Sequence, residues 1–376
     1  MTTRPELPAT TPLPVMDADG AFDLQQRLVE AMCEEMPGAA PFEADAGVRP
    51  PLGRPGTTAG VERVLARAFG GKAACLVQGA GTGAIRTALS AGPWRSGVRR
   101  LLVHDAPDYT TTAQTFADGC VETVRVDMGD DDALRAALAG SGDDAWVYVQ
   151  HTRQRLEDAF DPMAVVRLAV QHGRRVIVDD NYAVLRTPSI GVEHGAAASA
   201  FSLFKLHGPE GVGVVVGDAD LVDAAHAANY SGGGQVQGHQ ALEALRALVT
   251  VPLAWAAQAR EAARLAELLD AGHVPGVVGA RLANAQDLCV VALLEEPVAD
   301  AVRAAAAQLG AAPYPVGSNS RYEIAPMIYR LSSSALDSRP DLREWTLRIN
   351  PMRASAELTA RLVRRALDQV GGRHVS

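Results

Sequence analysis

Short, almost entirely apolar runs alternate with stretches of helical spacing through the first part of the chain. The seven runs lie at 74–78, 101–104, 121–127, 145–150, 174–180, 198–204 and 211–217. Amphipathic stretches separate most of them, such as the one at 161–173, which an Asp-Pro pair opens and a glycine closes. Strands that are apolar throughout are typical of a sheet covered on both faces. The pattern predicts an α/β fold with a mostly parallel seven-stranded sheet covered by helices.

The pattern changes on either side of this region. Residues 1 to about 20 are rich in Pro and Thr and predict a poorly ordered arm. Residues 240–270 have one long helical pattern that Pro252 breaks or kinks, and further strand and helix patterns follow it. We therefore expect an N-terminal arm and helix at 1–45, a large domain at 46–245 and a smaller C-terminal α/β domain at 246–376.

Composition and charge exclude several classes of protein. The chain has 376 residues and a formal net charge of -9, so no dominant basic field favours nucleic acid. Four cysteines without short spacing disfavour a disulfide scaffold or a zinc cluster, and no metal site is predicted. No apolar run approaches the roughly 20 residues that span a bilayer, and the N-terminus has no apolar signal core. We expect a soluble cytoplasmic protein.

Lysine is rare in this chain. Only Lys72 and Lys205 are lysines among 35 Lys and Arg residues, which leaves 33 arginines. A guanidinium stays charged, so arginine cannot replace an amine that must lose its proton and act as a nucleophile. Lys205 ends an apolar strand, where burial would lower the pKa of the amine. It is a candidate for Schiff-base chemistry, with a solubilising charge at a strand end as the alternative.

Two further features stand at the ends of neighbouring apolar runs. Asp179 is placed to pair with a protonated ring nitrogen of the kind found in pyridoxal phosphate. A cap or turn residue is the alternative, and Asp180 would point to the opposite side. The segment 78–84, QGAGTGA, places glycines at a helix start, where backbone N–H groups favour a phosphate. A structural tight turn is the alternative there, and the likeness to a dinucleotide fingerprint is weak.

Together these features resemble the fold-type-I pyridoxal-phosphate superfamily, the aspartate-aminotransferase-like enzymes. The D-x-x-Y at Asp179–Tyr182, the S-x-x-K at Ser202–Lys205 and the G-P-x-G-x-G at 208–213 match its patterns. The segments SLFKLHGPEGVGVVVGDAD, DDNYAV and YSGGGQVQG are similar to an uncharacterised bacterial aminotransferase-like branch. The resemblance spans roughly residues 50–355, and it implies a fold and a cofactor, pyridoxal 5'-phosphate.

The resemblance also implies a role for each residue around the cofactor. Lys205 would form the Schiff base and then move the α-proton, Asp179 would pair with the pyridine nitrogen, and Tyr182 would donate to the O3′ oxygen. The other cofactor-binding residues would be Gly81, Thr82, Gly83 and Ser202 at the phosphate, Tyr109 on the ring face, and Gln150 and His151 near O3′. His104 is the alternative to Tyr109 as the stacking residue.

Further implications concern the substrate and the subunit partner. Arg348, on a C-terminal strand, would clamp the substrate carboxylate bidentately, with Arg353 and Arg153 as alternatives. In relatives the glycine-rich segment at 230–238 reaches the neighbouring subunit's cofactor phosphate, which makes Gln235 a candidate. The resemblance therefore implies a homodimer with shared active sites.

These residues predict an enzyme that acts on an amino acid or related amine through a Cα carbanion, with transamination as the leading reaction. Class I aminotransferases typically have an Asn-Pro pair after the run 145–150, and this chain has neither residue there. Pyridoxal-phosphate-dependent β/γ-elimination or substitution is the close alternative. A non-catalytic pyridoxal-phosphate- or nucleotide-binding protein is the second alternative. A dinucleotide site would need an acidic residue about 20 positions after the glycines, and Asp105 lies at that distance.

Overall fold

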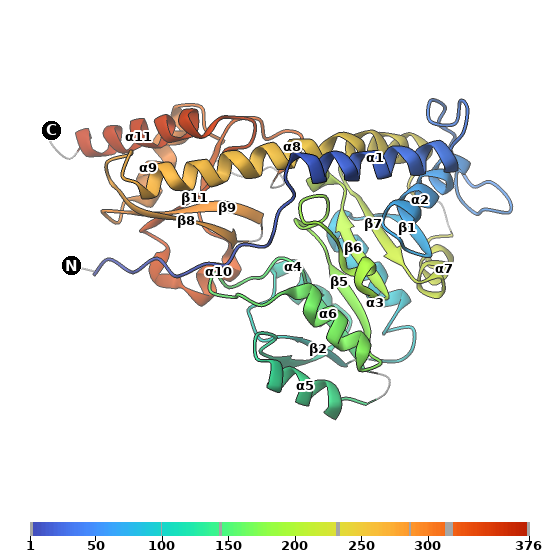
Figure 1. Ribbon diagram of the computed structural model, residues 1–376. Coiled ribbons are helices and arrows are strands. Elements are labelled where there is room, and N and C mark those ends of the chain that lie inside the picture. The colour runs from blue at the N-terminus through green and yellow to red at the C-terminus, as the bar shows by residue number, and fades with distance from the viewer. Residues whose placement is uncertain are drawn as a thin grey trace.

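Two sheets, one in each half of the molecule, organise the fold (Figure 1). The computed structural model describes residues 3–98, 100–142, 145–230, 234–285, 287–312 and 319–373. Up to the end of the larger sheet, the elements are α1 (Ala18–Glu35), α2 (Gly56–Ala68), β1 (Ala73–Gln78), α3 (Ala80–Ala91), β2 (Arg100–His104), α4 (Thr110–Asp118), β3 (Glu122–Val126), α5 (Asp131–Gly140), β4 (Trp146–Gln150), α6 (Pro162–Gln171), β5 (Arg175–Asp179), β6 (Ala198–Ser202) and β7 (Val212–Gly217).

The remaining elements form the rest of the chain. They are α7 (Ala219–Ala228), α8 (Gly238–Asp270), β8 (Val277–Ala285), β9 (Asp287–Leu294), α9 (Ala299–Gln308), β10 (Met327–Tyr329), α10 (Ser333–Ser338), β11 (Thr346–Asn350) and α11 (Ala356–Arg373). Three short 3-10 helices complete the fold: Gly191–His194, Phe204–Leu206 and Pro340–Leu342.

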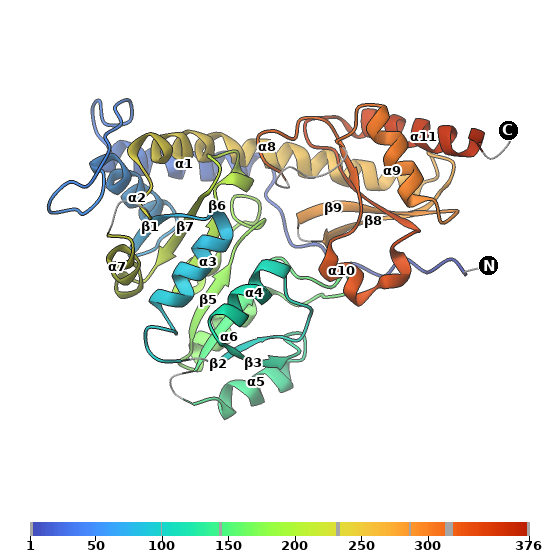
Figure 2. The same ribbon diagram turned by 180° about the vertical axis from the view of Figure 1, so that it is seen from behind.

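The larger sheet has the strand order β1-β7-β6-β5-β4-β2-β3. Strand β7 runs antiparallel to both of its neighbours, and the other paired strands are parallel. Helices α3 and α4 cover the face that is in front in Figure 2, and α6 covers the opposite face, in front in Figure 1. The predicted fold class, a mostly parallel seven-stranded sheet covered by helices, is confirmed.

Local sequence explains why α6, one of the covering helices, begins where it does. The Asp161 carboxylate accepts a hydrogen bond from the Met163 amide, and Pro162 occupies the first turn of α6. The strand that follows α6 is apolar in the middle, and its residues Val176, Ile177 and Val178 are buried between helices on both faces. Strand β5 ends at Asp179, which pairs in register with Gln150 at the end of β4.

The smaller sheet is antiparallel, with the order β10-β11-β9-β8. Helix α8 continues through Pro252 and connects the two halves of the molecule (Figure 1). Its first part packs in the core of the larger half through residues such as Leu248, and its last part packs under the smaller sheet through residues such as Leu265. The predicted boundary between domains at 245/246 therefore falls inside one helix.

The N-terminal arm runs along both halves of the molecule before α1 begins (Figure 1). The Thr10 hydroxyl donates to the Leu282 carbonyl oxygen at 2.6 Å, and the Leu13 amide donates to Asn284 Oδ1, also at 2.6 Å. The Met16 amide donates to the Arg186 carbonyl oxygen at 2.8 Å. A proline-rich segment has few internal hydrogen bonds, and this one obtains them from both halves, unlike the poorly ordered arm that composition predicts.

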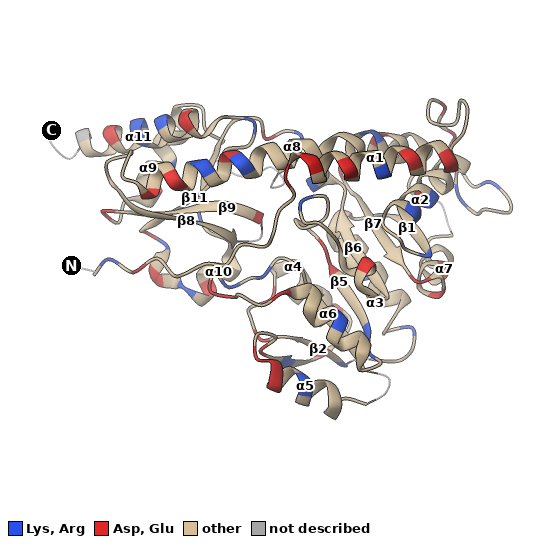
Figure 3. Cartoon of the chain, viewed as in Figure 1, with Lys and Arg blue, Asp and Glu red and all other residues tan. Residues whose placement is uncertain are grey.

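Charged residues of both signs are mixed over the surface. Helices α1, α8 and α11 each have acidic and basic side chains along their length (Figure 3). This mixing agrees with the absence of a dominant basic field in the composition. Among the described residues, no helix combines the length and the apolar character that crossing a membrane requires.

Candidate active site

A cavity of about 300 Å³ lies where β4, β5 and β6 end and α3 begins. Parallel strands end at a common sheet edge, so residues far apart in the sequence meet there, where ligands of α/β sheets bind. Eight of the residues predicted from the sequence line the cavity: Gly81, Thr82, Tyr109, Gln150, Asp179, Tyr182, Ser202 and Lys205.

Lys205 lies in the short 3-10 helix that follows β6. Its Nζ is 3.8 Å from the centroid of the Tyr182 ring and 5.9 Å from that of Tyr109. Among the described residues, no carboxylate lies within 4.0 Å of this amine. The other lysine, Lys72, is exposed and its Nζ is 3.0 Å from Asp218 Oδ1. Lys205 therefore lies in a cavity beside aromatic rings, whereas Lys72 is an exposed side chain in an ion pair.

Asp179 is the buried carboxylate of the cavity. Its Oδ1 accepts hydrogen bonds from the Asn181 amide at 3.0 Å and from Asn181 Nδ2 at 2.7 Å. Its Oδ2 accepts a hydrogen bond from the Tyr148 hydroxyl at 3.2 Å. Burial raises the pKa of Asp179, while the Asn181 bonds and the charge of Lys205 act in the opposite direction. These contacts fix the direction of the carboxylate toward the cavity.

The adjacent carboxylate, Asp180, has different partners. It is fully buried, and its Oδ1 lies 2.7 Å from Nδ1 of His151. Neither Asp180 nor His151 lines the cavity. Successive side chains at a strand end point to opposite faces, so only one carboxylate of the pair reaches the cavity, and it is Asp179. The structure therefore brings Gln150 into the cavity and places His151 outside it.

Glycines allow α3 to begin directly at the end of β1. Gly79 has a φ of +98°, in the left-handed region that favours glycine. A Cβ at Gly83 would lie 2.1 Å from the Gln78 carbonyl oxygen, and a Cβ at Gly81 would lie 2.5 Å from Asn181 Oδ1. The turn therefore requires glycine for reasons of space, and it brings the helix N-terminus against the cavity wall.

Hydrogen-bond donors without acceptors gather at this helix start. Among the described residues, the amides of Gly81 and Thr82 have no acceptor. The Ser202 hydroxyl is buried on the cavity wall and also has no partner in the described part of the chain. Buried polar groups are nearly always paired, and a helix N-terminus favours an anion. These three donors fit a phosphate group, and Asp179 fits a protonated ring nitrogen, so the residues present fit pyridoxal 5'-phosphate.

Tyr109 precedes the first residue of α4 and lines the cavity opposite Lys205. Burial raises the pKa of its phenol, and Tyr182 adds to this effect while Lys205 opposes it. The phenol therefore stays protonated at neutral pH and is able to donate a proton. His104 lies elsewhere, outside the cavity lining, with its ring 4.8 Å from that of Phe160.

Three more predicted residues lie outside the cavity lining. Gly83 lies within the first turn of α3, behind the wall. The Gln235 side chain donates to the carbonyl oxygens of Tyr230 and Gly53, and its Oε1 is buried without a partner among the described residues. Arg348 is buried in the smaller half, where it forms an ion pair with Asp287. Its predicted substrate contact would therefore compete with an existing pair.

Sequence reasoning missed Asn181 and Arg186. Asn181 orients Asp179, and its Oδ1 accepts a hydrogen bond from the Ser202 amide at 3.0 Å, which ties β5 to β6. Arg186 is buried over the Trp255 ring at 4.0 Å, and its Nε and one terminal nitrogen have no partner in the described part of the chain. Burial lowers its pKa to about 10. Asn181 lies in the D-x-x-Y stretch, a usable signal, whereas nothing separates Arg186 from 32 other arginines.

Comparisons with known proteins find one family in particular. Residues 263–363 match the model of the YhfS-like C-terminal domain. The chain is 44% identical to the uncharacterized protein YhfS of Escherichia coli (strain K12) over 365 residues, which cover 96% of this chain and 99% of that protein.

Solved structures agree with this match. The crystal structure of the pyridoxal-5'-phosphate-dependent protein YhfS from Escherichia coli has a TM-score of 0.92 and 43% identity, and covers 96% of this chain and 99% of that chain. A cystathione gamma lyase, CalE6 from Micromonospora echinospora, has a TM-score of 0.70 at 22% identity, and covers 92% of this chain and 99% of that one. The second likeness shows a shared fold.

Proposed function

The chain belongs to the YhfS family, whose solved member from Escherichia coli is a pyridoxal-5'-phosphate-dependent protein, and we propose from this premise that it eliminates or replaces a substituent on the β or γ carbon of an amino acid. Its cofactor is pyridoxal 5'-phosphate. The substrate is an amino acid or a closely related amine. The observation that supports the proposal most is the single cavity in which Lys205, Asp179 and unpaired phosphate donors meet.

The cavity residues divide into groups that would hold the cofactor. The Lys205 amine would hold its aldehyde carbon, the Asp179 carboxylate its ring nitrogen, and Ser202 with the amides of Gly81 and Thr82 its phosphate. Tyr182 lies beside Lys205, where its hydroxyl is available to the ring oxygen. When bound, pyridoxal phosphate withdraws electrons from the substrate's Cα and so weakens the bonds to that carbon.

The chain's own residues then move two protons. Lys205 is the amine in the cavity and is placed to take the proton from Cα. Tyr109 faces Lys205 and keeps its phenolic proton, because burial raises the pKa of the phenol. It is placed to give that proton to a departing sulfur or oxygen group. Asp179 stays in a fixed direction through Asn181 and Tyr148, so that its negative charge is available to the ring nitrogen.

Elimination or substitution has more support than transamination, the reaction that sequence resemblance placed first. A protonated phenol beside the lysine serves the loss of a leaving group, a step that transamination lacks. The fold neighbour CalE6 is named as a lyase, and the Asn-Pro pair typical of class I aminotransferases is absent after β4. Transamination therefore becomes the second outcome of the test below.

The test uses the cofactor-loaded protein and amino acids with a β or γ leaving group, such as O-acetylserine and O-acetylhomoserine, with alanine as the control. Elimination predicts keto acid and ammonia from a leaving-group substrate, with the cofactor unchanged. Accumulation of pyridoxamine phosphate with alanine would instead establish transamination. Absence of both, with the cofactor bound, and absence of a replacement product when a thiol is added as the nucleophile, would leave a binding protein and contradict the proposed activity.

A Tyr109→Phe variant separates the two proton transfers. We expect keto acid release to fall by about 10²-fold, because a positioned proton donor contributes at least this much. Exchange of the Cα proton in deuterated water, followed by NMR, should continue, because Lys205 is intact. Equal loss of both signals would show that Tyr109 acts in binding and not as the proton donor for the leaving group.

We also propose a homodimer in which the partner completes the site, as the resemblance implied. Gln235 Oε1 is buried without a partner in the described part of one chain, and the neighbouring Tyr230 is 67% exposed. An aromatic ring left in solvent beside an unpaired buried amide is typical of a surface that another chain covers. Sedimentation equilibrium should give twice the chain mass, and a monomer that binds the cofactor and turns over substrate would contradict the proposal.

A further inference from the structure

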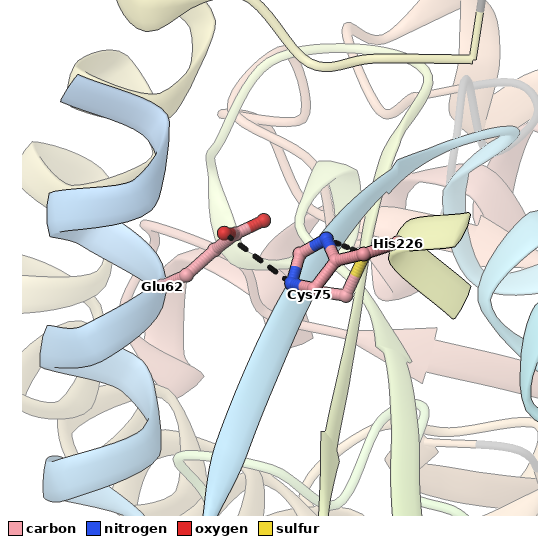
Figure 4. A group of neighbouring side chains, drawn as sticks. All are labelled: Glu62, Cys75 and His226. Carbon is pink, nitrogen blue, oxygen red and sulfur yellow. Dashed lines mark hydrogen bonds and ion pairs between the residues drawn. The ribbon is translucent and has the colours of Figure 1, made fainter. Parts of the chain in front are cut away.

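Three side chains that are able to bind a metal meet beside β1, the outermost strand on one side of the larger sheet. None of them lines the Lys205 cavity. Glu62 comes from α2, Cys75 from β1 and His226 from α7, and they point toward one another (Figure 4). Cys75 Sγ lies 3.4 Å from His226 Nδ1, and Glu62 Oε2 lies 3.7 Å from His226 Nε2. One ligand atom from each residue lies within 4.8 Å of the other two.

The trio is held in place from outside. Glu62 and Cys75 are buried. The Glu62 carboxylate accepts a hydrogen bond from the Leu76 amide on one oxygen at 2.9 Å and one from Arg54 Nε on the other at 2.5 Å. Each carboxylate oxygen keeps a further lone pair. Such outer contacts are the kind that orient metal ligands.

Arg54 adds a positive charge beside the trio, since its Nε lies 2.5 Å from Glu62 Oε2. A divalent cation binds a thiolate, a carboxylate and a neutral imidazole, so its binding would release the proton of the Cys75 thiol.

One of the two separations suits a tetrahedral cation directly. With metal bonds of about 2.0–2.3 Å, two ligands of one zinc ion lie roughly 3.5 Å apart. The 3.4 Å between Cys75 Sγ and His226 Nδ1 is close to this value. The Glu62 oxygen lies 3.7 Å from the other ring nitrogen, Nε2, so a cation held by Nδ1 and the sulfur requires the carboxylate to move toward them.

The ligand set also decides which cation fits. Mg²⁺ and Ca²⁺ prefer oxygen ligands, whereas a thiolate with an imidazole selects zinc-class ions. A cavity of about 170 Å³ adjoins the trio, and Asn229 and Tyr230 also line it. It shares no lining residue with the Lys205 cavity. The cavity leaves a fourth position open to water or a small ligand.

We propose that Glu62, Cys75 and His226 bind one zinc-class divalent cation. The cation would tie α2 and α7 to β1. The three positions are far apart in the sequence, and Cys75 and His226 are separated by 151 positions. No short cysteine or histidine spacing therefore indicates the site.

The experiment titrates the cofactor-loaded, metal-stripped full chain with Co²⁺ and follows the d–d bands at the red end of the visible spectrum, where bound pyridoxal phosphate does not absorb. We expect one Co²⁺ per chain with the intense bands of a tetrahedral site. Cys75→Ala and His226→Ala should each weaken binding by at least about 100-fold, more than the loss of an outer-shell contact. Cys289→Ala removes another buried thiol, in the smaller half, and should bind Co²⁺ as the parent does.

A second measurement guards against a variant that fails to fold. Zn²⁺ should raise the melting temperature of the parent and of Cys289→Ala but not that of His226→Ala, whose folding is checked by far-UV circular dichroism. Absence of stoichiometric Co²⁺ binding by the parent would overturn the proposal. Co²⁺ binding by Cys75→Ala and His226→Ala that is as strong as the parent's would also overturn it, because the ion would then lie elsewhere.

Discussion

The cavity around Lys205 and the cluster around Arg348 both contain charged side chains inside the protein, but among the described residues only the second has its opposite charges joined in an ion pair. Asp287 forms an ion pair with Arg348 and accepts hydrogen bonds from Asn319 and Asn350, each at 2.6 Å. In the cavity, by contrast, Lys205 has ring contacts alone and the Ser202 hydroxyl has no partner among the described residues.

This difference separates a structural cluster from a binding site. A buried polar group without a partner is costly, so a protein retains one where a ligand supplies the missing contact. Arg348 already has Asp287 as its counter-ion, although its Nε has no hydrogen-bond partner among the described residues. The comparison therefore predicts that changes at the Arg348 cluster affect stability most, and that changes in the cavity affect cofactor binding and turnover most.

The largest effect is expected at Lys205. Lys205→Ala should reduce turnover by roughly 10⁴-fold, since it removes the amine that holds the cofactor and moves the proton. Lys72→Ala is the matched control, because it removes the other lysine, an exposed one paired with Asp218, and should retain full turnover. Steady-state kinetics on both variants measure this. A Lys205→Ala protein with parental turnover would contradict the proposed role of the Lys205 amine.

The next effect is expected at the paired cluster. Asp287→Ala leaves Arg348 buried without its counter-ion and should reduce the free energy of unfolding by about 3–5 kcal/mol. Urea unfolding of the cofactor-free protein measures this. A loss below about 1 kcal/mol would show that the pair is not structural and would return Arg348 to the substrate role that the sequence suggested.

A pH dependence is expected at Glu62 in the metal-free protein. Its pKa is about 7 in the fold against a usual 4.5, so the unfolded chain loses this proton first as the pH rises. Stability should fall between about pH 4.5 and 7, by about 3 kcal/mol at 1.36 kcal/mol per pKa unit. Glu62→Gln should lack this part of the slope. Urea unfolding at pH 5 and pH 8 compares the two, and identical slopes would contradict the shift.

The smallest effect is expected at Ser202. Ser202→Ala removes one donor to a charged phosphate and should weaken cofactor affinity by about 1.5–3 kcal/mol, roughly 10–100-fold. Stability of the cofactor-free protein should be unchanged, because the hydroxyl has no partner in the described part of the chain. Visible absorbance after equilibrium dialysis measures the affinity. An unchanged affinity would place the phosphate elsewhere in the cavity.

Local patterns predicted the sheet and much of the cavity. The apolar runs predicted the strands of the larger sheet, and strand ends meet at one edge, so Asp179 and Lys205 come together although they are 26 positions apart in the sequence. What the sequence could not show depends on partners distant in the chain. Arg348 is one arginine among many until the fold supplies Asp287, and His151 pairs with Asp180 because of the strand's alternation, which a short motif does not reveal.

The proposed chemistry requires that the Lys205 amine holds the cofactor. Borohydride reduction of the cofactor-loaded protein, followed by proteolysis and mass spectrometry, fixes the bound cofactor to its amine and identifies the residue. The account predicts a pyridoxyl label on the peptide that contains Lys205 and none on the peptide that contains Lys72. A label on Lys72, or a cofactor that remains fully dialysable after reduction, would contradict it.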